Sequence, residues 1–448
     1  YCKDCGKPIC TPETIDAVSR LFEEKGSNAW FEMTAEEILP QGFTCPHCGK
    51  SAGFEQESDT LDGWFDSGST HFASMERTQG FWPATMYLEG LDQYRGWFQS
   101  SLLTAVGAFG EGAPFKECVT HGWTVDGEGR AMHKSLGNGV DPADIFNENG
   151  ADILRLWAAS ADYHADVRCS KAIFQQLSQN YLKFRNTCKF MLDNLVDFDP
   201  AHLTKAEDMP VLDRWLITKL NELIEKVEQS YNDYEFHIIT HAVNDFCVTT
   251  LSSFYLDIVK DRLYCEAADS AERRSAQTAL YLTLSTLAKL FAPILAFTCD
   301  EIWLAMPHTA EDDARNVVLN DMNKPFTAYA LDAETMARWE HIIEVRTAVN
   351  GALEEARAAK VIGKSLEADV HLTVPEGDVF LADENPAALA DLFIVSKVEL
   401  TVGGELAVKV ENAAGTKCPR CWKHSLTPNA EGLCPRCAEV VRHLPDLL

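Results

Sequence analysis

The spacing of apolar side chains along the chain predicts a large helical region in its centre. Apolar residues recur every three or four positions from Ile173 to Leu195, which is the period of an amphipathic helix. The same period predicts helices over 211–231, 236–264 and 276–306. Pro293 should break the last of these, because proline has no amide hydrogen to donate inside a helix. Short connections between long helices favour an antiparallel bundle.

The segments on either side of this bundle follow other patterns. Residues 57–168 alternate short apolar runs with glycine-rich turns, which indicates an α/β region. Residues 308–335 are polar and acidic, as expected of a connector. Beyond them we expect a helix over 339–359 and strands over 369–374 and 397–402, which together predict a small α+β piece.

The composition is that of a folded globular protein without a membrane-spanning segment. Apolar residues make up 46% and charged residues 24% of the 448 residues. No apolar run approaches the roughly twenty residues that cross a membrane. The net charge of −29 opposes indiscriminate binding to nucleic acids, although a local basic surface would suffice for a specific contact.

The start of the chain and its cysteines indicate a reducing, cytoplasmic environment. Tyr1 follows no secretory leader and stands directly before a cysteine pair, so we expect an internal piece of a longer polypeptide. The chain has fifteen cysteines. In a reducing compartment, paired cysteines hold metal more often than they form disulfides.

The strongest local signal is a pair of Cys-x-x-Cys motifs near the end of the chain. Twelve residues separate Cys418-Pro-Arg-Cys421 from Cys434-Pro-Arg-Cys437. Four thiolates complete a tetrahedral zinc site and leave no open position, so the site would be structural. The alternative is a coincidental set of buried thiols.

Cations and an aromatic ring surround these motifs. From residue 416 to the end, five Lys or Arg face three Asp or Glu, a local net charge of +2. This surface suits a phosphate backbone with a stacking platform. Alternatively, the cations offset the negative charge of a four-thiolate zinc centre. The residues concerned are Lys417, Arg420, Trp422, Lys423, His424 and Arg436.

A second metal site is predicted at the other end of the chain. Its spacing is a weaker signal, because thirty-nine residues separate the two cysteine pairs. Cys10 and His47 are alternative ligands. The four predicted zinc ligands are Cys2, Cys5, Cys45 and Cys48.

A glycine-flanked loop carries the next candidate chemistry. Gly127, Gly129 and Gly137 surround Lys134 and Ser135, shortly before an Asp-Pro helix start. A cation on such a loop suits closure over a polyphosphate, where it would neutralise charge as pyrophosphate leaves. The order of residues is not that of a Walker loop, and from this pattern alone an ordinary surface loop is the alternative.

Five segments in a fixed order carry a resemblance to a known family. They are Asp59 to His71, which contains Trp-Phe-Asp-Ser-Gly, Tyr87 to Phe98, His121 to Trp123, the Lys134 loop, and Gly150 to Trp157. Together they resemble the second half of a class I aminoacyl-tRNA synthetase, and the wording of the first segment favours the isoleucine-specific members. The resemblance spans essentially the whole chain.

The resemblance implies roles for the Lys134 loop. In this family a Lys-Met-Ser-Lys-Ser loop binds ATP, and here it reads Ala131-Met-His133-Lys134-Ser135. Lys134 matches the second lysine, whereas Ala131 and His133 replace the first lysine and the middle serine. One cation is therefore missing from the transition state, and Arg130 is the neighbouring candidate to supply it.

The resemblance also assigns the binding of the activated amino acid. Glu89, Gly90, Asp92 and Gln93 match positions that hold the aminoacyl-adenylate. Trp64 and Trp97 match aromatic residues that wall the isoleucine side-chain pocket. Without the resemblance, core packing would be the alternative for both tryptophans.

The implied architecture is multidomain. We expect a zinc-knuckle connective module over 1–56 and a partial, Rossmann-like α/β second half of the catalytic domain over 57–168. An all-α, anticodon-binding helical bundle would cover 169–335, a small α+β junction 336–410 and a zinc module 411–448. Candidate RNA contacts on the bundle are Lys183, Arg185, Arg214 and Lys219.

The implied activity is isoleucine–tRNA ligation in the cytoplasm, by an enzyme that is monomeric at full length. ATP with Mg²⁺ would activate isoleucine, which passes to tRNA(Ile), and no membrane is involved. The family's His-x-Gly-His motif is absent from the 448 residues, so the chain alone should be inactive. A valine- or methionine-type synthetase and a non-catalytic, zinc-containing RNA-binding protein are the alternatives.

Overall fold

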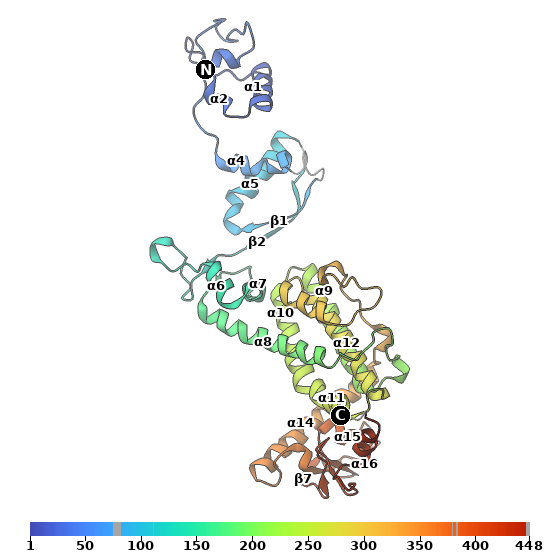
Figure 1. The fold of residues 1–448 in the computed structure, drawn as a ribbon. Coiled ribbons are helices and arrows are strands. Elements are labelled where there is room, and N and C mark those ends of the chain that lie inside the picture. Colours follow the sequence, from blue (N-terminus) through green and yellow to red (C-terminus); the bar gives the residue numbers. More distant parts are fainter. Residues whose placement is uncertain (75–81, 111, 379, 382–383, 445–448) are drawn as a thin grey trace. The chain divides into compact units, whose positions relative to one another are not determined.

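The computed structural model of the protein describes residues 1–74, 82–110, 112–378, 380–381 and 384–444. The chain divides into two compact units, 1–121 and 122–448, and each is described by itself. α/β regions lie in both units, and the central part of the second is helical (Figure 1). The multidomain class predicted from the sequence is therefore confirmed in outline.

The first unit begins with a small module built around cysteines. Helix α1 (Pro12–Lys25) starts where the Thr11 hydroxyl accepts a hydrogen bond from the Thr14 amide, and it ends at Gly26, whose φ of 79° favours glycine. Short helices α2 (Ala29–Glu32) and α3 (Ala35–Ile38) follow. The small core consists of Cys2, Ala35, Cys45 and Phe54.

The rest of the first unit is a βα arrangement. Strands β1 (Ala84–Gly90) and β2 (Phe115–His121) pair in parallel, with Gly90 opposite His121. Tyr87 and Phe98 form the core of this part with Ala84. The helical elements are α4 (Gly63–Gly68), η2 (Leu91–Arg95), α5 (Trp97–Leu103) and η3 (Thr104–Ala108).

The second unit opens with the part that carries the Lys134 loop. Strands β3 (Thr124–Val125) and β4 (Val167–Arg168) pair in parallel at its base. Helix α6 (Pro142–Asn149) begins where Asp141 accepts a hydrogen bond from the Ala143 amide, as the Asp-Pro pair predicts. The remaining elements are η4 (Lys134–Leu136) and α7 (Ala151–Ser160). Ile145, Ile153, Cys169 and Phe174 form a small core here.

Long helices then form the bundle that the apolar period predicted. The predicted helix 236–264 contains a π-helical stretch in its middle, and the predicted helix 276–306 is broken after Phe291, next to Pro293. A large apolar core joins these helices to the elements that follow them. The helices are α8 (Lys171–Asp193), η5 (Ala206–Asp208), α9 (Val211–Asn232), α10 (Phe236–Asp245), η6 (Phe246–Tyr255), α11 (Leu256–Cys265), α12 (Ala271–Phe291) and α13 (Ala296–Ala305).

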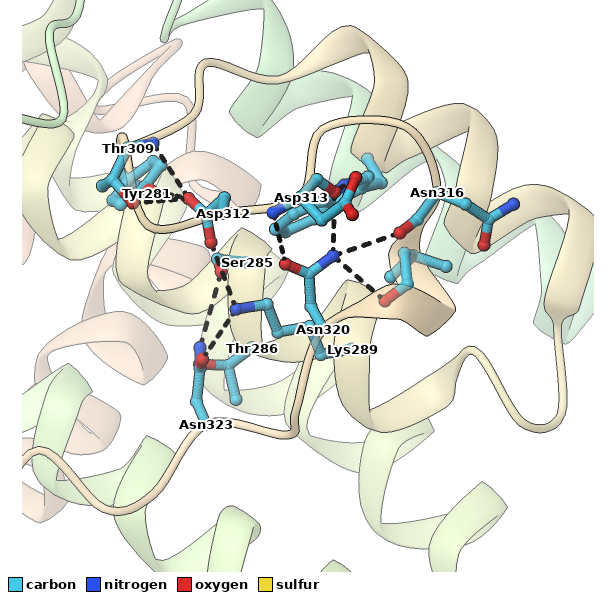
Figure 2. A network of polar contacts seen from close by, with 12 residues as sticks. Tyr281, Ser285, Thr286, Lys289, Thr309, Asp312, Asp313, Asn316, Asn320 and Asn323 are labelled. Atoms are coloured by element: carbon cyan, nitrogen blue, oxygen red, sulfur yellow. Dashed lines mark hydrogen bonds and ion pairs between the residues drawn. The ribbon is translucent and has the colours of Figure 1, made fainter.

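The polar connector is fastened to the bundle by side-chain hydrogen bonds. It contains η7 (Val317–Leu319) and η8 (Thr327–Tyr329). Lys289 of α12, whose side chain is only 10% exposed, pairs with Asp312 at 3.5 Å and donates to the Asn323 side chain at 3.1 Å (Figure 2). A buried cation with two oxygen partners fixes the connector to one face of the helix.

The α+β piece is more complete than its sequence pattern predicted. The strand order is β6-β5-β7, in which β5 is parallel to β6 and antiparallel to β7. Strand β7 and helix α15 were not predicted. The elements are α14 (Ala333–Ala358), η9 (Ser365–Glu367), β5 (Ala368–Val374), α15 (Pro386–Phe393), β6 (Lys397–Val402) and β7 (Ala407–Asn412).

A small cysteine-containing module ends the described chain. Strands β8 (Thr416–Lys417) and β9 (His424–Ser425) form an antiparallel pair, and helix α16 (Pro435–Arg442) follows. Among the described residues of both units, no helix is long and apolar enough to cross a membrane.

Candidate functional site

The acidic segment predicted to hold an adenylate lies where strand β1 ends. Gly90 is the last residue of β1, and Asp92 and Gln93 lie in η2 directly after it. The Asp92 and Glu89 side chains are exposed, and the Gln93 amide donates to Asp92 at 3.1 Å. In α/β folds, ligands bind beyond the carboxyl ends of parallel strands, which is where these side chains lie.

Two aromatic side chains stand beside this segment. Trp97 is packed, since its ring stacks on Tyr87 at 4.2 Å and its indole N–H donates to the Ser67 carbonyl at 3.0 Å. Trp64 is 44% exposed, and a Cβ placed on Gly96 would come within 3.1 Å of its ring. The missing Cβ at Gly96 therefore lets the Trp64 ring lie directly on the backbone that follows Gln93.

The Lys134 loop, in the second unit, is held at its base by Asp126 and Asn138. The Asn138 amide donates to Asp126 at 2.9 Å and to the Ala131 carbonyl at 3.1 Å, and its oxygen accepts from the His133 amide at 2.9 Å. Hydrogen bonds from Asn138 and from the Arg130 backbone lower the pKa of the Asp126 carboxyl well below its ordinary value. The sequence did not predict these hydrogen bonds between Asp126, Asn138 and the loop backbone.

Lys134 and Ser135 lie exposed at the tip of the loop. Among the residues that the structure describes, Lys134 forms no ion pair. Its ammonium group is therefore available to a bound anion. Arg130, by contrast, is held by Asp126 and Glu128, each at 2.9 Å. The Arg130 guanidinium thus has two carboxylate partners within the loop.

Both predicted cysteine clusters are assembled. In each, the four sulfur atoms lie within 4.8 Å of one another. The Cys2–Cys48, Cys5–Cys45 and Cys421–Cys434 sulfur pairs are 3.6, 3.8 and 3.7 Å apart. A tetrahedral zinc ion with Zn–S bonds of about 2.3 Å requires sulfur pairs about 3.8 Å apart, so both clusters fit zinc. The two sets are Cys2, Cys5, Cys45 and Cys48, and Cys418, Cys421, Cys434 and Cys437.

Backbone groups support the same assignment. The His47 amide donates to the Cys45 sulfur, and the Cys434 amide donates to the Cys418 sulfur, each at 3.4 Å. Such bonds stabilise thiolates, which are the form of cysteine that binds metal. His47 itself contacts the Pro8 carbonyl at 3.2 Å, and neither it nor Cys10 belongs to the cluster.

The cations around the second cluster are bound within the chain. Arg436 forms two hydrogen bonds with Asp261, at 2.5 and 2.8 Å, and a third with Glu266 at 2.9 Å. Arg420 donates to the Cys265 carbonyl at 2.5 Å. These bonds attach the cysteine module to the end of helix α11, so both guanidinium groups already have partners within the chain.

Two other predicted RNA-contact residues of this module form ion pairs within the chain. Lys417 pairs with Glu367 at 3.2 Å, and Lys423 pairs with Asp391. Trp422 differs, because it is 51% exposed and stands at a φ of 66°. Lys364 lies 5.2 Å from its ring centroid. A half-exposed ring beside a cation is therefore the part of this surface that remains available for stacking.

On the helical bundle, two of the four candidate RNA contacts have structural partners instead. Arg214 donates to the carbonyls of Tyr329 and Ala330, at 3.1 and 2.7 Å. Lys219 pairs with Glu222 and Glu340 at 3.2 and 3.1 Å. Both residues hold the connector or α14 against α9. Lys183 and Arg185 are exposed on α8.

Two families of known domains match this chain. Residues 1–170 match the family described as tRNA synthetases class I (I, L, M and V), and residues 213–372 match the anticodon-binding domain of tRNA ligase. The first match contains the acidic segment Glu89–Gln93 and the Lys134 loop, and the second contains most of the helical bundle. The chain belongs to the class I aminoacyl-tRNA synthetases.

Within this class, the chain corresponds to the C-terminal part of bacterial isoleucine–tRNA ligases. It is 47% identical to the isoleucine–tRNA ligase of Caldanaerobacter subterraneus over 98% of this chain and 48% of the relative. It is 49% identical to that of Desulforamulus reducens over 99% of this chain and 49% of the relative. The chain thus spans about half the length of the curated relatives it matches.

A solved structure supports the fold. The LeuRS of Agrobacterium radiobacter K84, in a ternary complex with tRNA and LeuAMS, matches with a TM-score of 0.51 over 83% of this chain and 38% of that chain. The sequence identity is 16%, so the likeness concerns the fold alone.

Proposed function

We propose that the protein to which this chain belongs activates isoleucine with ATP and transfers it to tRNA(Ile). The observation that carries the proposal is the identity of 46–49% with isoleucine–tRNA ligases along 98–100% of the chain. Isoleucine, ATP and tRNA(Ile) are the proposed substrates. We further propose that the enzyme acts as a cytoplasmic monomer.

We assign the chemistry to side chains in both units. Lys134 and Ser135 bind ATP, and the Lys134 ammonium neutralises charge on the phosphates as pyrophosphate leaves. Glu89 and Asp92 bind the ammonium group and ribose hydroxyls of the aminoacyl-adenylate, together with Gly90 and Gln93. The Trp64 and Trp97 rings wall the pocket for the isoleucine side chain. The assignment of the adenylate is supported by the position of Glu89 and Gly90 at the end of β1, with Asp92 and Gln93 directly after it.

The proposed domains follow the sequence-based boundaries. Residues 1–56 form a connective zinc module and 57–168 the second half of the Rossmann-like catalytic domain. Residues 169–335 form the helical anticodon-binding domain, 336–410 form a small α+β junction, and 411–448 form the C-terminal zinc module.

Both zinc ions are proposed to be structural. Each set of four cysteines would complete the coordination of zinc and leave no position for substrate, so zinc supplies folding energy here and takes no part in catalysis. Mg²⁺ would enter with ATP. The chain contains no His-x-Gly-His sequence, so half of the proposed ATP site lies outside these 448 residues and the chain alone should not activate isoleucine.

The test is isoleucine-dependent exchange of pyrophosphate into ATP by the full-length protein. Lys134→Ala should lower kcat about a hundredfold, because it removes a positioned cation from the developing charge. Lys171→Ala is the control, since this exposed lysine on α8 pairs with Glu148 at 3.2 Å. Equal rates for the two variants would contradict the role of Lys134, and no exchange by the parent protein would contradict the proposed function.

A further inference from the structure

The segment Gly150 to Trp157 helped to identify the family but has no role in the proposed chemistry. It forms helix α7, which connects two different cores. Ile153 belongs to the small core beneath the Lys134 loop, whereas Leu156 belongs to the large core of the bundle. Helix α7 therefore packs against the loop-bearing part on one side and against the bundle on the other (Figure 1).

The bundle has a break at the point that α7 contacts. Helix α12 ends at Phe291 and α13 begins at Ala296, with Pro293 between them. The end of a helix leaves carbonyl groups without partners, and the start of a helix leaves amide groups without partners. Pro293 is exposed, but Ile294 and Leu295 are buried, so polar backbone groups on the buried side of the break need partners from another element.

Asp152 and Arg155 supply both kinds of partner. Asp152, which is 7% exposed, accepts hydrogen bonds from the Thr298 amide at 2.7 Å and the Thr298 hydroxyl at 2.6 Å. Arg155 donates to the Ile294 carbonyl at 2.9 Å and the Pro293 carbonyl at 2.6 Å. The two side chains are three residues apart and lie on the same side of α7, so one helix face satisfies both ends of the break.

Two further contacts extend this connection. The Tyr181 hydroxyl of α8 lies 3.0 Å from the Thr298 hydroxyl. In the other direction, Met132 of the Lys134 loop packs against the small core that contains Ile153. Side chains in contact thus lead from the loop, through α7, to the start of α13.

We propose that Asp152 and Arg155 are positioning residues that hold the Lys134 loop at a fixed orientation to the helical bundle. The effect of these residues on the transfer of isoleucine to tRNA rests on the proposed function. A tRNA held by the bundle would then reach the catalytic centre in one register. Loss of the connection should impair the transfer of isoleucine to tRNA more than its activation, because activation does not require the bundle to be aligned.

The test compares Asp152→Ala and Arg155→Gln in the full-length protein with Asp144→Asn, a change of an exposed carboxylate on the neighbouring helix α6. Arg155→Lys is the conservative variant, which keeps the charge and should restore part of the effect. Three quantities are measured: kcat for aminoacylation, the rate of tRNA-free pyrophosphate exchange, and the Kd for tRNA. Amide hydrogen exchange at Thr298 reports whether the Asp152 bond is broken.

We expect aminoacylation to fall about tenfold in Asp152→Ala, with exchange and tRNA Kd within about twofold of the parent. Faster hydrogen exchange at Thr298 with unchanged aminoacylation would overturn the inference. A parallel loss of all three quantities would also overturn it, since it would indicate a role in folding alone.

If the parent protein charges no tRNA with isoleucine, the proposed function is refuted. The connection between the Lys134 loop and the bundle is then tested by hydrogen exchange alone. Asp152→Ala must speed exchange across α6 and α7 without changing α9, and uniform exchange would refute the connection.

Discussion

Asp126 and Asn138 hold the Lys134 loop through bonds that short-range sequence patterns do not reveal. The glycines and the lysine mark the loop in the sequence, but Asp126 and Asn138 lie twelve residues apart and meet only when the loop folds back on itself. The position of Arg130 next to Ala131 makes it the candidate substitute for the missing cation, and this stays a prediction. The structure pairs its guanidinium with Asp126 and Glu128.

Asn138→Ala should loosen the loop and slow the activation of isoleucine. It removes the bonds to Asp126, Ala131 and His133, each contributing about 1 kcal/mol, so the rate of pyrophosphate exchange should fall about tenfold or more. Asn147→Ala changes an exposed asparagine on α6 and serves as the matched control. Equal pyrophosphate exchange rates in both variants would show that the function of the loop does not depend on the Asn138 hydrogen bonds.

At the scale of elements, apolar periodicity predicted what is long and regular. Helices α8 and α9 were predicted almost to their ends, and Pro293 marked the break between α12 and α13. Strand β7 was missed because only Val408 and Val410 mark its partly buried face, and an alternation over so few residues is a weak signal. The π-helical stretch η6 leaves no signal in the period, because its flanking helices continue the same apolar face.

The cysteine module illustrates the same limit for contacts. The cysteine spacing predicted four sulfurs around one point, and the structure confirms the cluster. The partners of Arg436 lie 170 and 175 residues away, so no local pattern could indicate them. The hydrogen bonds that Arg436 donates to Asp261 raise the pKa of the Arg436 guanidinium further above its ordinary value, so the docking contact stays charged.

Arg436→Gln should release the module from α11 without emptying its metal site. The lost bonds to Asp261 and Glu266 should lower the free energy of unfolding by about 2 kcal/mol, while zinc content stays the same. Arg442→Gln, which changes an exposed pair with Glu439, is the control. Unchanged stability by thermal denaturation, or zinc lost together with stability, would contradict a docking role.

Cys418→Ser should have a different effect from Arg436→Gln. Loss of one thiolate opens the tetrahedral site, so we expect zinc loss, unfolding of the segment from β8 to α16, and weaker tRNA binding by the full-length protein. Zinc content by atomic absorption and tRNA affinity by filter binding measure both effects. Unchanged zinc content together with unchanged tRNA affinity would rule out the structural role.

At the scale of the whole molecule, the family could be predicted from the sequence more clearly than the arrangement of the domains. Motifs in a fixed order indicated a class I synthetase, and relatives aligned along the chain support this family. The adenylate segment and the Lys134 loop belong to different units, and their joint chemistry depends on residues outside this chain as well. The account therefore predicts activity for the full-length protein and none for the 448 residues by themselves.

The measurement that tests this account most directly is pyrophosphate exchange by the full-length protein with isoleucine, leucine, methionine and valine in turn. The account predicts that isoleucine gives the highest kcat/KM, because we propose that Trp64 and Trp97 wall a pocket for its side chain. A higher kcat/KM with methionine, leucine or valine, or no exchange with any of the four, would contradict it.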